Sequence, residues 1–91
     1  ELYTEPFARA FASGERAGLE SFSKYRRAAD VAAAHRLGVN AGHDLDLDNL
    51  LLFRTLPHLA EVSIGHALIS RALWVGLDRA VRDYLDVLAP S

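Results

Sequence analysis

Two segments of the sequence share one layout, and together they restrict the possible folds more than any other feature. The apolar stretch Val39-Asn40-Ala41 runs into Gly42-His43, and Val62-Ser63-Ile64 runs into Gly65-His66. Each pattern indicates a short strand that leads through Gly-His into a helix. Glycine allows a ligand to approach the backbone closely, and a helix start offers unpaired N–H groups to an anion. We therefore expect two glycines and two imidazoles at one end of a sheet, arranged to hold a phosphate group.

The rest of the chain is predicted to alternate between strands and helices. Gly38 is expected to take the left-handed position that ends a long helix, and Pro6 to break the first strand. Alternation of this kind implies parallel strands with right-handed crossovers, so the predicted fold class is α/β. About three β/α units are present, as in part of a (β/α)8 barrel or an open sheet. Strands are predicted over residues 2–4, 39–41 and 60–64, and helices over 7–12, 16–37, 49–56, 66–75 and 77–88.

The predicted helices carry apolar faces for packing. The stripe on the long helix is Leu19, Phe22, Arg26, Ala29, Ala33 and Leu37, and that on the last helix is Leu77, Val81, Tyr84, Leu85 and Leu88. Trp74 is expected in the core or at an interface. The helical arginines of the last third are expected to be solvated or to contact another subunit: Arg71, Arg79 and Arg82.

Charge and composition argue against several classes of partner. The net charge is -2 and the ten basic residues are scattered, so nothing favours nucleic acid or an acidic membrane. The chain has no cysteine, which excludes disulfides and thiolate metal sites and suits a reducing cytoplasm, the expected location. Its apolar runs are too short to cross a bilayer.

No metal or other cofactor is expected. Asp44, Asp46 and Asp48 alternate as in a calcium loop, but that loop requires Gly at its sixth position and Glu at its twelfth. This chain has Asn49 and Thr55 there. Asp46 or Asp48 is instead expected to cap the helix that follows. The four histidines lack the i, i+4 pairing of a helical metal site.

The ends of the chain suggest that it is part of a longer protein. It contains no methionine and starts with Glu1-Leu2-Tyr3-Thr4, which has the pattern of a strand end. Because a natural reading frame begins with Met, we expect further sequence before Glu1, and we expect Ala89-Pro90-Ser91 to be the C-terminus.

Four residues are the main candidates for chemistry. His43 follows a strand end and is either a general acid or base or a solvated loop residue that caps a helix. Gly65 and His66 either bind phosphate through their amides or form a tight turn that needs glycine. Glu1 would be functional if its carboxylate pointed inward from a strand.

These residues also carry a family resemblance. Val39-Asn40-Ala41-Gly42-His43, followed by Ile64-Gly65-His66-Ala67 with Ile69, Arg71 and Ala72, and by Gly76-Leu77, closely resembles the C-terminal part of the pyridoxine 5′-phosphate synthase family. The opening Glu1-Leu2-Tyr3-Thr4 resembles the sixth strand of that family. The resemblance covers nearly the whole chain, and the segment from Pro6 to Tyr25 is the least similar part.

The resemblance implies a fold and an activity. The family's enzyme is a (β/α)8 TIM barrel, a transferase that assembles as a homo-octamer. It condenses 3-amino-2-oxopropyl phosphate with 1-deoxy-D-xylulose 5-phosphate into pyridoxine 5′-phosphate, phosphate and water, in vitamin B6 biosynthesis. Residues 1–91 would then be the C-terminal part of one barrel domain, inactive alone because other catalytic residues lie on earlier strands.

The resemblance also assigns roles to residues. It makes His43 the proton donor and Glu1 the strand-six glutamate that stabilises a transition state, which we expect to point into the barrel. Gly65 and His66 match the pair that binds the aminoketone phosphate. Asp44 falls on a substrate-contacting position that is glycine in some relatives, which leaves the role of its side chain open.

Two other functions remain open. Another phosphate-binding barrel enzyme, an aldolase or isomerase, would share the phosphate site, but a Schiff-base aldolase needs a lysine on an inner strand. Lys24, the one lysine of the chain, is predicted on a helix. A non-catalytic α/β interaction module would have to bury its sheet unaided.

Overall fold

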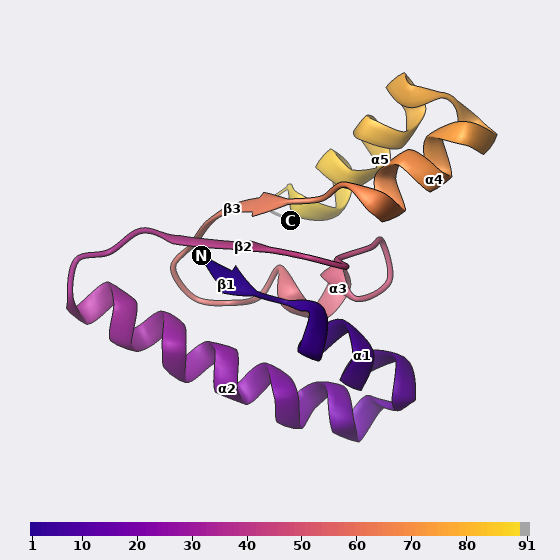
Figure 1. Ribbon diagram of the computed structural model, residues 1–91. Helices are drawn as coiled ribbons and strands as arrows, with labels where there is room; N and C mark the ends of the chain where they lie inside the picture. The colour runs from indigo at the N-terminus through magenta and orange to yellow at the C-terminus, as the bar shows by residue number, and fades with distance from the viewer. Residues whose placement is uncertain (90–91) are drawn as a thin grey trace.

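Three parallel strands form one sheet, with helices following each strand, in a computed structural model that describes residues 1–89 (Figure 1). Pro90 and Ser91, which belong to the expected C-terminus, lie outside the described residues. The mixed α/β architecture with parallel strands confirms the predicted class. In chain order the elements are β1 (Leu2–Tyr3), α1 (Glu5–Ser13), α2 (Glu15–Ala34), β2 (Val39–Gly42), α3 (Leu50–Phe53), β3 (Leu59–Ser63), α4 (His66–Val75) and α5 (Leu77–Leu88).

The sheet has one apolar and one polar face. Its strand order is β1-β2-β3, and the register pairs Leu2 with Ala41 and Ala41 with Val62, all of which contribute to the core. Successive side chains in a strand point to opposite faces. Gly42 and Ser63, the next pair in the register, therefore face away from this core, at the carboxyl ends of their strands.

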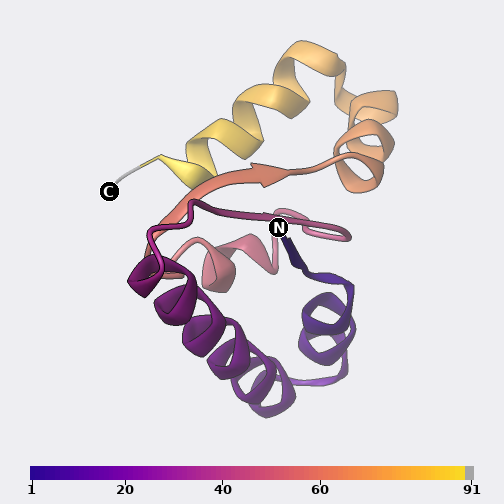
Figure 2. The same cartoon turned by 60° about the vertical axis from the view of Figure 1, so that its left-hand side comes forward.

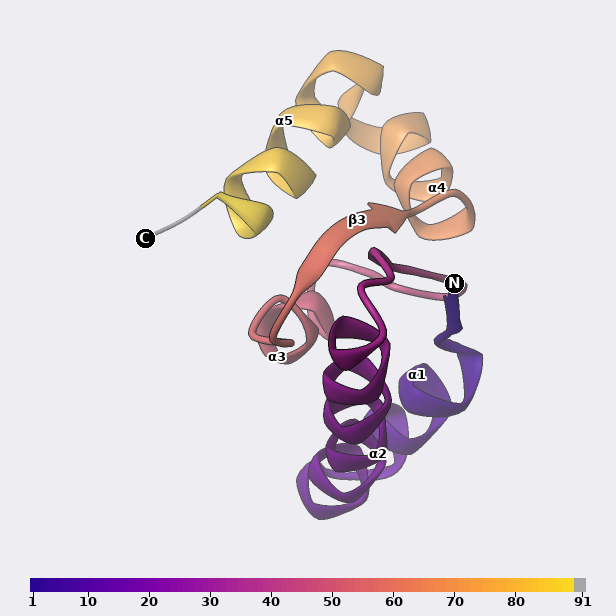
Figure 3. The same cartoon turned by 90° about the vertical axis from the view of Figure 1, so that its left-hand side faces the viewer.

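The apolar face is covered by α1, α2 and α3, while α4 and α5 lie beyond β3 (Figures 2 and 3). An aromatic cluster joins these helices: the Phe7 ring is fully buried, and its centroid lies 5.0 Å from that of Phe53 and 6.1 Å from that of Phe22. Burying such rings is the main source of stability in a core of this size. The core therefore holds the sheet from one side and leaves the Gly42–Ser63 face free.

The long helix ends earlier than predicted. Its last residue is Ala34, and the left-handed residue is Arg36, at φ 60°, in place of the expected Gly38. The Arg36 and Leu37 amides donate to the carbonyls of Ala33 and Ala32, which is a Schellman motif. Because the motif satisfies two otherwise unpaired carbonyls, it offsets the cost of a left-handed arginine.

Two other predicted helices have different bounds. Pro6 lies in the first turn of α1, where a missing N–H costs little, so the helix begins at Glu5 and not at residue 7. The helix expected over 49–56 is helical only from Leu50 to Phe53. The N-cap residue of α3 is Asn49, which makes no side-chain cap hydrogen bond, whereas the Oδ1 of Asp46 accepts from the amides of Asp48 and Asn49 in the turn that leads into the helix. By contrast, α4 and α5 have the predicted bounds.

The predicted apolar stripes are only partly buried. In α5 the buried residues are Ala80 and Tyr84, whereas Leu77 and Leu85 are each 60% exposed. Trp74 is 90% exposed, so of its two expected places the core is wrong for the described chain, and the interface stays a prediction. In α2, Leu19 is exposed. Within residues 1–89, no helix combines the length and apolar character needed to cross a membrane.

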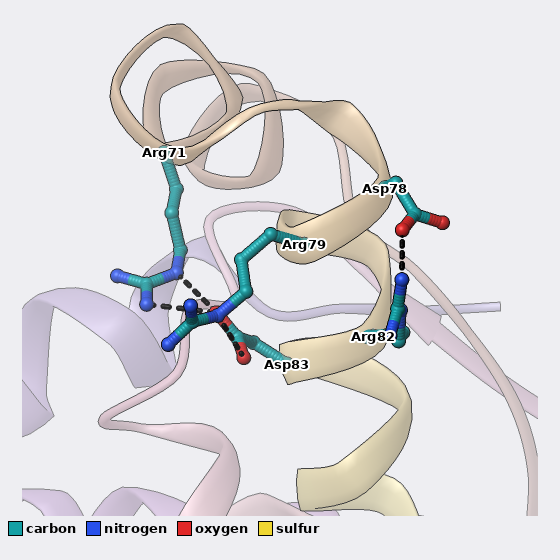
Figure 4. A network of polar contacts seen from close by, with 5 residues as sticks. All are labelled: Arg71, Asp78, Arg79, Arg82 and Asp83. Carbon is teal, nitrogen blue, oxygen red and sulfur yellow. Dashed lines mark hydrogen bonds and ion pairs between the residues drawn. The ribbon is translucent and has the colours of Figure 1, made fainter.

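The arginines of α4 and α5 form ion pairs within the chain (Figure 4), and Arg79 and Arg82 are also solvated, as expected, with side chains 69% and 70% exposed. Arg71 on α4 donates to the Asp83 carboxylate on α5 at 2.8 and 2.9 Å, and Arg79 lies 3.5 Å from the same group. Arg82 pairs with Asp78. The hydrogen bond from Arg71 is the main cause that lowers the pKa of Asp83. This network therefore ties the two helices to each other.

Replacing Asp83 with asparagine is expected to lower the melting temperature of the protein by a few degrees near pH 7, because it removes the charge that links α4 to α5. The folded state lowers the Asp83 pKa, so ionised Asp83 stabilises the fold above the ordinary aspartate pKa of ~3.9. That contribution is lost as the pH falls through the lowered folded-state value. Thermal melts of both proteins at pH 7 and at successively lower pH measure the difference between their melting temperatures, which should shrink as the pH falls.

The matched control for this variant is Glu20→Gln. It removes an exposed pair on α2 in which the Arg16 and Glu20 groups lie 3.3 Å apart. Exposed pairs of this kind contribute little stability, so the control should melt close to the wild type. Equal losses in the two variants at pH 7 would contradict the importance of the α4–α5 network.

Candidate functional site

The carboxyl ends of β2 and β3 border a cavity of about 470 Å³ on the polar face of the sheet. Parallel strands bring their carboxyl ends to one edge, which is why segments far apart in the sequence meet here. Both Gly-His segments contribute to it. The lining residues are Glu1, Gly42, His43, Asp44, Ser63, Ile64, Gly65 and His66.

His43 lies where the chain turns away from β2. Its φ is 112° and that of Asp44 is 60°, so two consecutive non-glycine residues have left-handed backbone. Each costs on the order of 1–3 kcal/mol, and such residues persist only where surrounding contacts hold them. The imidazole ring packs against the Tyr3 ring of the neighbouring strand, with centroids 4.8 Å apart. The histidine is thus presented at the mouth of the cavity by a strained turn.

Glu1 lies on the polar face of the sheet, opposite the face that α1, α2 and α3 cover. A Cβ placed on Gly42 would come within 3.0 Å of the Glu1 Oε2 atom and within 3.0 Å of the Ser63 Cβ. The missing side chain of Gly42 is therefore what lets the Glu1 carboxylate and Ser63 approach the centre of the sheet. Residue types alone predicted a glycine for ligand approach here; the structure shows that it also makes room for neighbouring strands.

Replacing Gly42 with alanine is expected to destabilise the protein by about 1–3 kcal/mol, the usual cost of overpacking a filled site. The Glu1 side chain can move aside, but the Ser63 carbonyl, 3.2 Å from the added Cβ, belongs to a paired strand and cannot. Urea unfolding of both proteins measures the loss. Gly38→Ala is the control, because a Cβ there meets no atom within 4 Å. If Gly42→Ala were as stable as the wild type, the strands would be able to move apart at no cost, and the prediction would be wrong.

Gly65 and His66 form the start of α4. Gly65 is the N-cap residue, with φ -127°, and no side chain caps the helix. The Gly65 carbonyl accepts from the Ile69 amide, which is the first hydrogen bond of the helix. The amides of residues 66–68 come before this bond and have no partner within the helix, so they can bind an anion. A Cβ on Gly65 would meet no atom within 4 Å. No neighbouring atom therefore requires glycine at this position, whereas φ -127° with ψ -73° lies outside the regions that non-glycine residues prefer, so both interpretations of this segment stay open.

The site contains two carboxylates and two imidazoles, of Glu1, Asp44, His43 and His66, and all four residues are exposed. Across residues 1–89, no three His, Cys, Asp or Glu side chains come together in a group able to hold a metal ion. The arrangement can thus offer proton transfer from an imidazole and anion binding from a helix start, side by side.

Sequence patterns assigned no role to three residues that shape the site. Ser63 lines the cavity because the register places it beside Gly42, and Tyr3 on β1 and Thr4 directly after it reach His43. The Tyr25 hydroxyl on α2 donates to the Tyr3 carbonyl at 2.6 Å, and burial raises the pKa of Tyr25. These contacts depend on strand pairing, which leaves no local signal in the sequence.

Comparison with known proteins gives consistent matches over nearly the whole chain. The family model for the pyridoxal phosphate biosynthesis protein PdxJ matches residues 1–90. The pyridoxine 5′-phosphate synthase of Leptospira biflexa serovar Patoc is 54% identical over 89 residues, covering 98% of this chain and 34% of the relative. Those of Flavobacterium johnsoniae and Porphyromonas gingivalis are 52% and 51% identical and are covered to 36% and 37%. The chain spans about a third of the length of these relatives.

Proposed function

This chain belongs to the PdxJ family of pyridoxal phosphate biosynthesis proteins, and from that premise we propose that it is the C-terminal part of a pyridoxine 5′-phosphate synthase. The relatives it matches carry that name. The proposed reaction condenses 3-amino-2-oxopropyl phosphate with 1-deoxy-D-xylulose 5-phosphate and releases phosphate and water. Both substrates are phosphorylated, which fits a site built at a helix start.

The proposed fold of the whole protein is a (β/α)8 barrel, of which residues 1–91 form the last units. The three strands are parallel and adjacent in chain order, as barrel strands are. Their apolar face packs on helices, and the opposite face, with Gly42 and Ser63, would line the barrel interior. In a barrel the active site lies at the carboxyl ends of the strands, where the cavity lies here. A homo-octamer is part of the proposal by family resemblance.

His43 is proposed as the proton donor. Ring formation requires imine formation, dehydration and loss of phosphate, so protons must reach departing oxygen atoms. An imidazole that titrates near neutral pH can deliver them. The observation that carries this assignment is that His43 borders the same cavity as the start of α4, so a substrate phosphate held there would leave its reacting carbons within the cavity.

Gly65 and His66 are proposed to bind the phosphate of the aminoketone. Their amides lie at the start of the ten-residue helix α4, whose dipole favours an anion. Glu1, on the same cavity, is proposed to stabilise the positive charge that develops as the imine forms. Asp44 is proposed to contact substrate, and the strained backbone around it places it at the rim.

The direct test is turnover of the two phosphorylated substrates by the full-length protein. Formation of pyridoxine 5′-phosphate with release of one phosphate would support the proposal. A protein that bound the aminoketone phosphate but formed no product would favour a different phosphate-binding barrel enzyme. Lys24 lies on α2 beside Leu2 and Pro6, away from this cavity, so this chain offers no lysine for a Schiff-base aldolase.

A further inference from the structure

We propose that Thr4 is a positioning residue that holds His43 in its strained backbone conformation and thereby keeps the imidazole at the cavity. Thr4 follows β1 and is fully buried, although it is polar. It has no place among the residues that line the cavity. The inference rests on the proposed function, since positioning matters for turnover only if His43 transfers a proton.

Two hydrogen bonds from Thr4 bracket His43. The Thr4 amide donates to the Gly42 carbonyl at 3.0 Å, and the Thr4 hydroxyl donates to the His43 carbonyl at 2.6 Å. The first carbonyl belongs to the peptide unit before the His43 Cα, and the second to the unit after it. Rotation about φ or ψ of His43 would move one of these units relative to the other, so one residue restrains both dihedral angles.

The backbone of His43 needs such a restraint. At φ 112° a histidine is far from the regions that non-glycine residues prefer, and the next residue, Asp44, is left-handed as well. Because Thr4 is 39 residues away in the chain, the restraint comes from tertiary contact and not from the turn itself. Without it, the turn can relax to negative φ, which would swing the imidazole to a different direction.

The segment that carries Thr4 is itself fixed. The Tyr3 carbonyl accepts from the Tyr25 hydroxyl on α2, and the Tyr3 ring packs on the His43 ring. Thr4 also accepts, through its own carbonyl, from the Ala8 amide at the start of α1. The end of β1 therefore supports the turn that follows β2. The Thr4 hydroxyl makes the side-chain hydrogen bond from this support to the turn.

The test replaces Thr4 in the full-length enzyme by valine, which keeps the shape of the side chain and removes the hydroxyl. We expect kcat to fall about tenfold or more, because a misplaced catalytic group costs that much, while KM for both substrates changes by less than about twofold. Thr4→Ser keeps the hydroxyl and should retain kcat within about threefold. Thr55→Val, which removes an exposed hydroxyl bonded to the Leu52 carbonyl, is the control and should match the wild type.

A double-mutant cycle separates positioning from a merely structural role. If Thr4 acts through His43, adding Thr4→Val to His43→Asn should lower kcat by less than about twofold further. A further tenfold fall would overturn the inference, as would an unchanged kcat in Thr4→Val alone where His43→Asn itself lowers kcat. If the valine variant does not fold, Thr4→Cys, with a weaker donor of similar size, replaces it in the same cycle.

A structural readout keeps this inference separate from the proposed function. In a crystal structure of the full-length Thr4→Val variant, we expect His43 to leave the left-handed region. That result supports the positioning role even if His43→Asn has normal turnover. Normal turnover of His43→Asn would count against the proposed role of His43 in catalysis, and not against its positioning by Thr4. An unchanged His43 backbone in that structure would overturn the positioning role whatever the kinetics.

Discussion

Replacing His43 with asparagine in the full-length enzyme is expected to lower kcat by about a hundredfold or more, while the affinity for the aminoketone phosphate stays close to the wild-type value. Asparagine keeps a polar side chain of similar reach and can also occupy left-handed backbone, but it cannot transfer a proton near neutral pH. The phosphate is proposed to bind at Gly65 and His66, on a different strand end, and so should be unaffected. Steady-state kinetics and titration of the phosphate substrate measure the two effects.

His35→Asn is the matched control, because His35 caps the end of α2 with its Nδ1 2.9 Å from the Val31 carbonyl, outside the cavity. It should leave kcat unchanged. Near-normal turnover of His43→Asn would remove this residue from the mechanism. A parallel loss of phosphate affinity would instead mean that the imidazole binds substrate as well as transferring a proton.

Replacing Gly65 with valine is expected to abolish binding of 3-amino-2-oxopropyl phosphate, a fall of at least about a hundredfold, because the side chain would occupy the space in front of the α4 amides. A Cβ at this position meets no atom of the chain within 4 Å, so the added side chain clashes with nothing in the fold, and the backbone at φ -127° and ψ -73° adds only local strain. The loss of affinity should therefore be much larger than any fall in the melting temperature accounts for. Calorimetric titration together with thermal melts separates the two.

His66→Ala tests whether the contact is made by the main chain. It keeps the amide at the start of α4 and should weaken binding only modestly, by about tenfold at most. Gly38→Val is the control for adding a branched side chain at an open glycine away from the cavity. If His66→Ala lost affinity as severely as Gly65→Val, the imidazole would be the main ligand and the backbone assignment would be wrong.

The elements that the sequence predicted best are those whose signals are local. The bounds of α4 and α5 agree with prediction because glycines lie at their borders and apolar residues recur at helical spacing between them. The strands before Gly42 and Gly65 are also where the pattern indicated them, within one residue at each end. The meeting of the two Gly-His segments at one cavity follows from parallel pairing alone.

The predictions that failed depended on distant neighbours. The apolar residues of α5 indicated its buried face only in part, because Leu77 and Leu85 find no cover in the described chain while Ala80 does. Likewise Arg71 was expected in solvent or at a contact with another subunit, and the pattern did not indicate its ion pair with Asp83, because that partner lies on the next helix and periodicity within one helix says nothing about helix pairing.

By itself, the sequence of this chain determined the order of strands and helices, their parallel pairing and the placement of Gly-His at strand ends. These follow from short-range preferences and from the chirality of strand crossovers, which act within a few residues or apply to every chain. Only the tertiary structure decided which side chains complete the site. Thr4 and His43 are 39 residues apart, and only strand pairing brings the Thr4 hydroxyl to the carbonyl of His43, whose left-handed backbone we propose it holds. Such strain is stable only when contacts from elsewhere in the fold hold it, and no local pattern records those contacts.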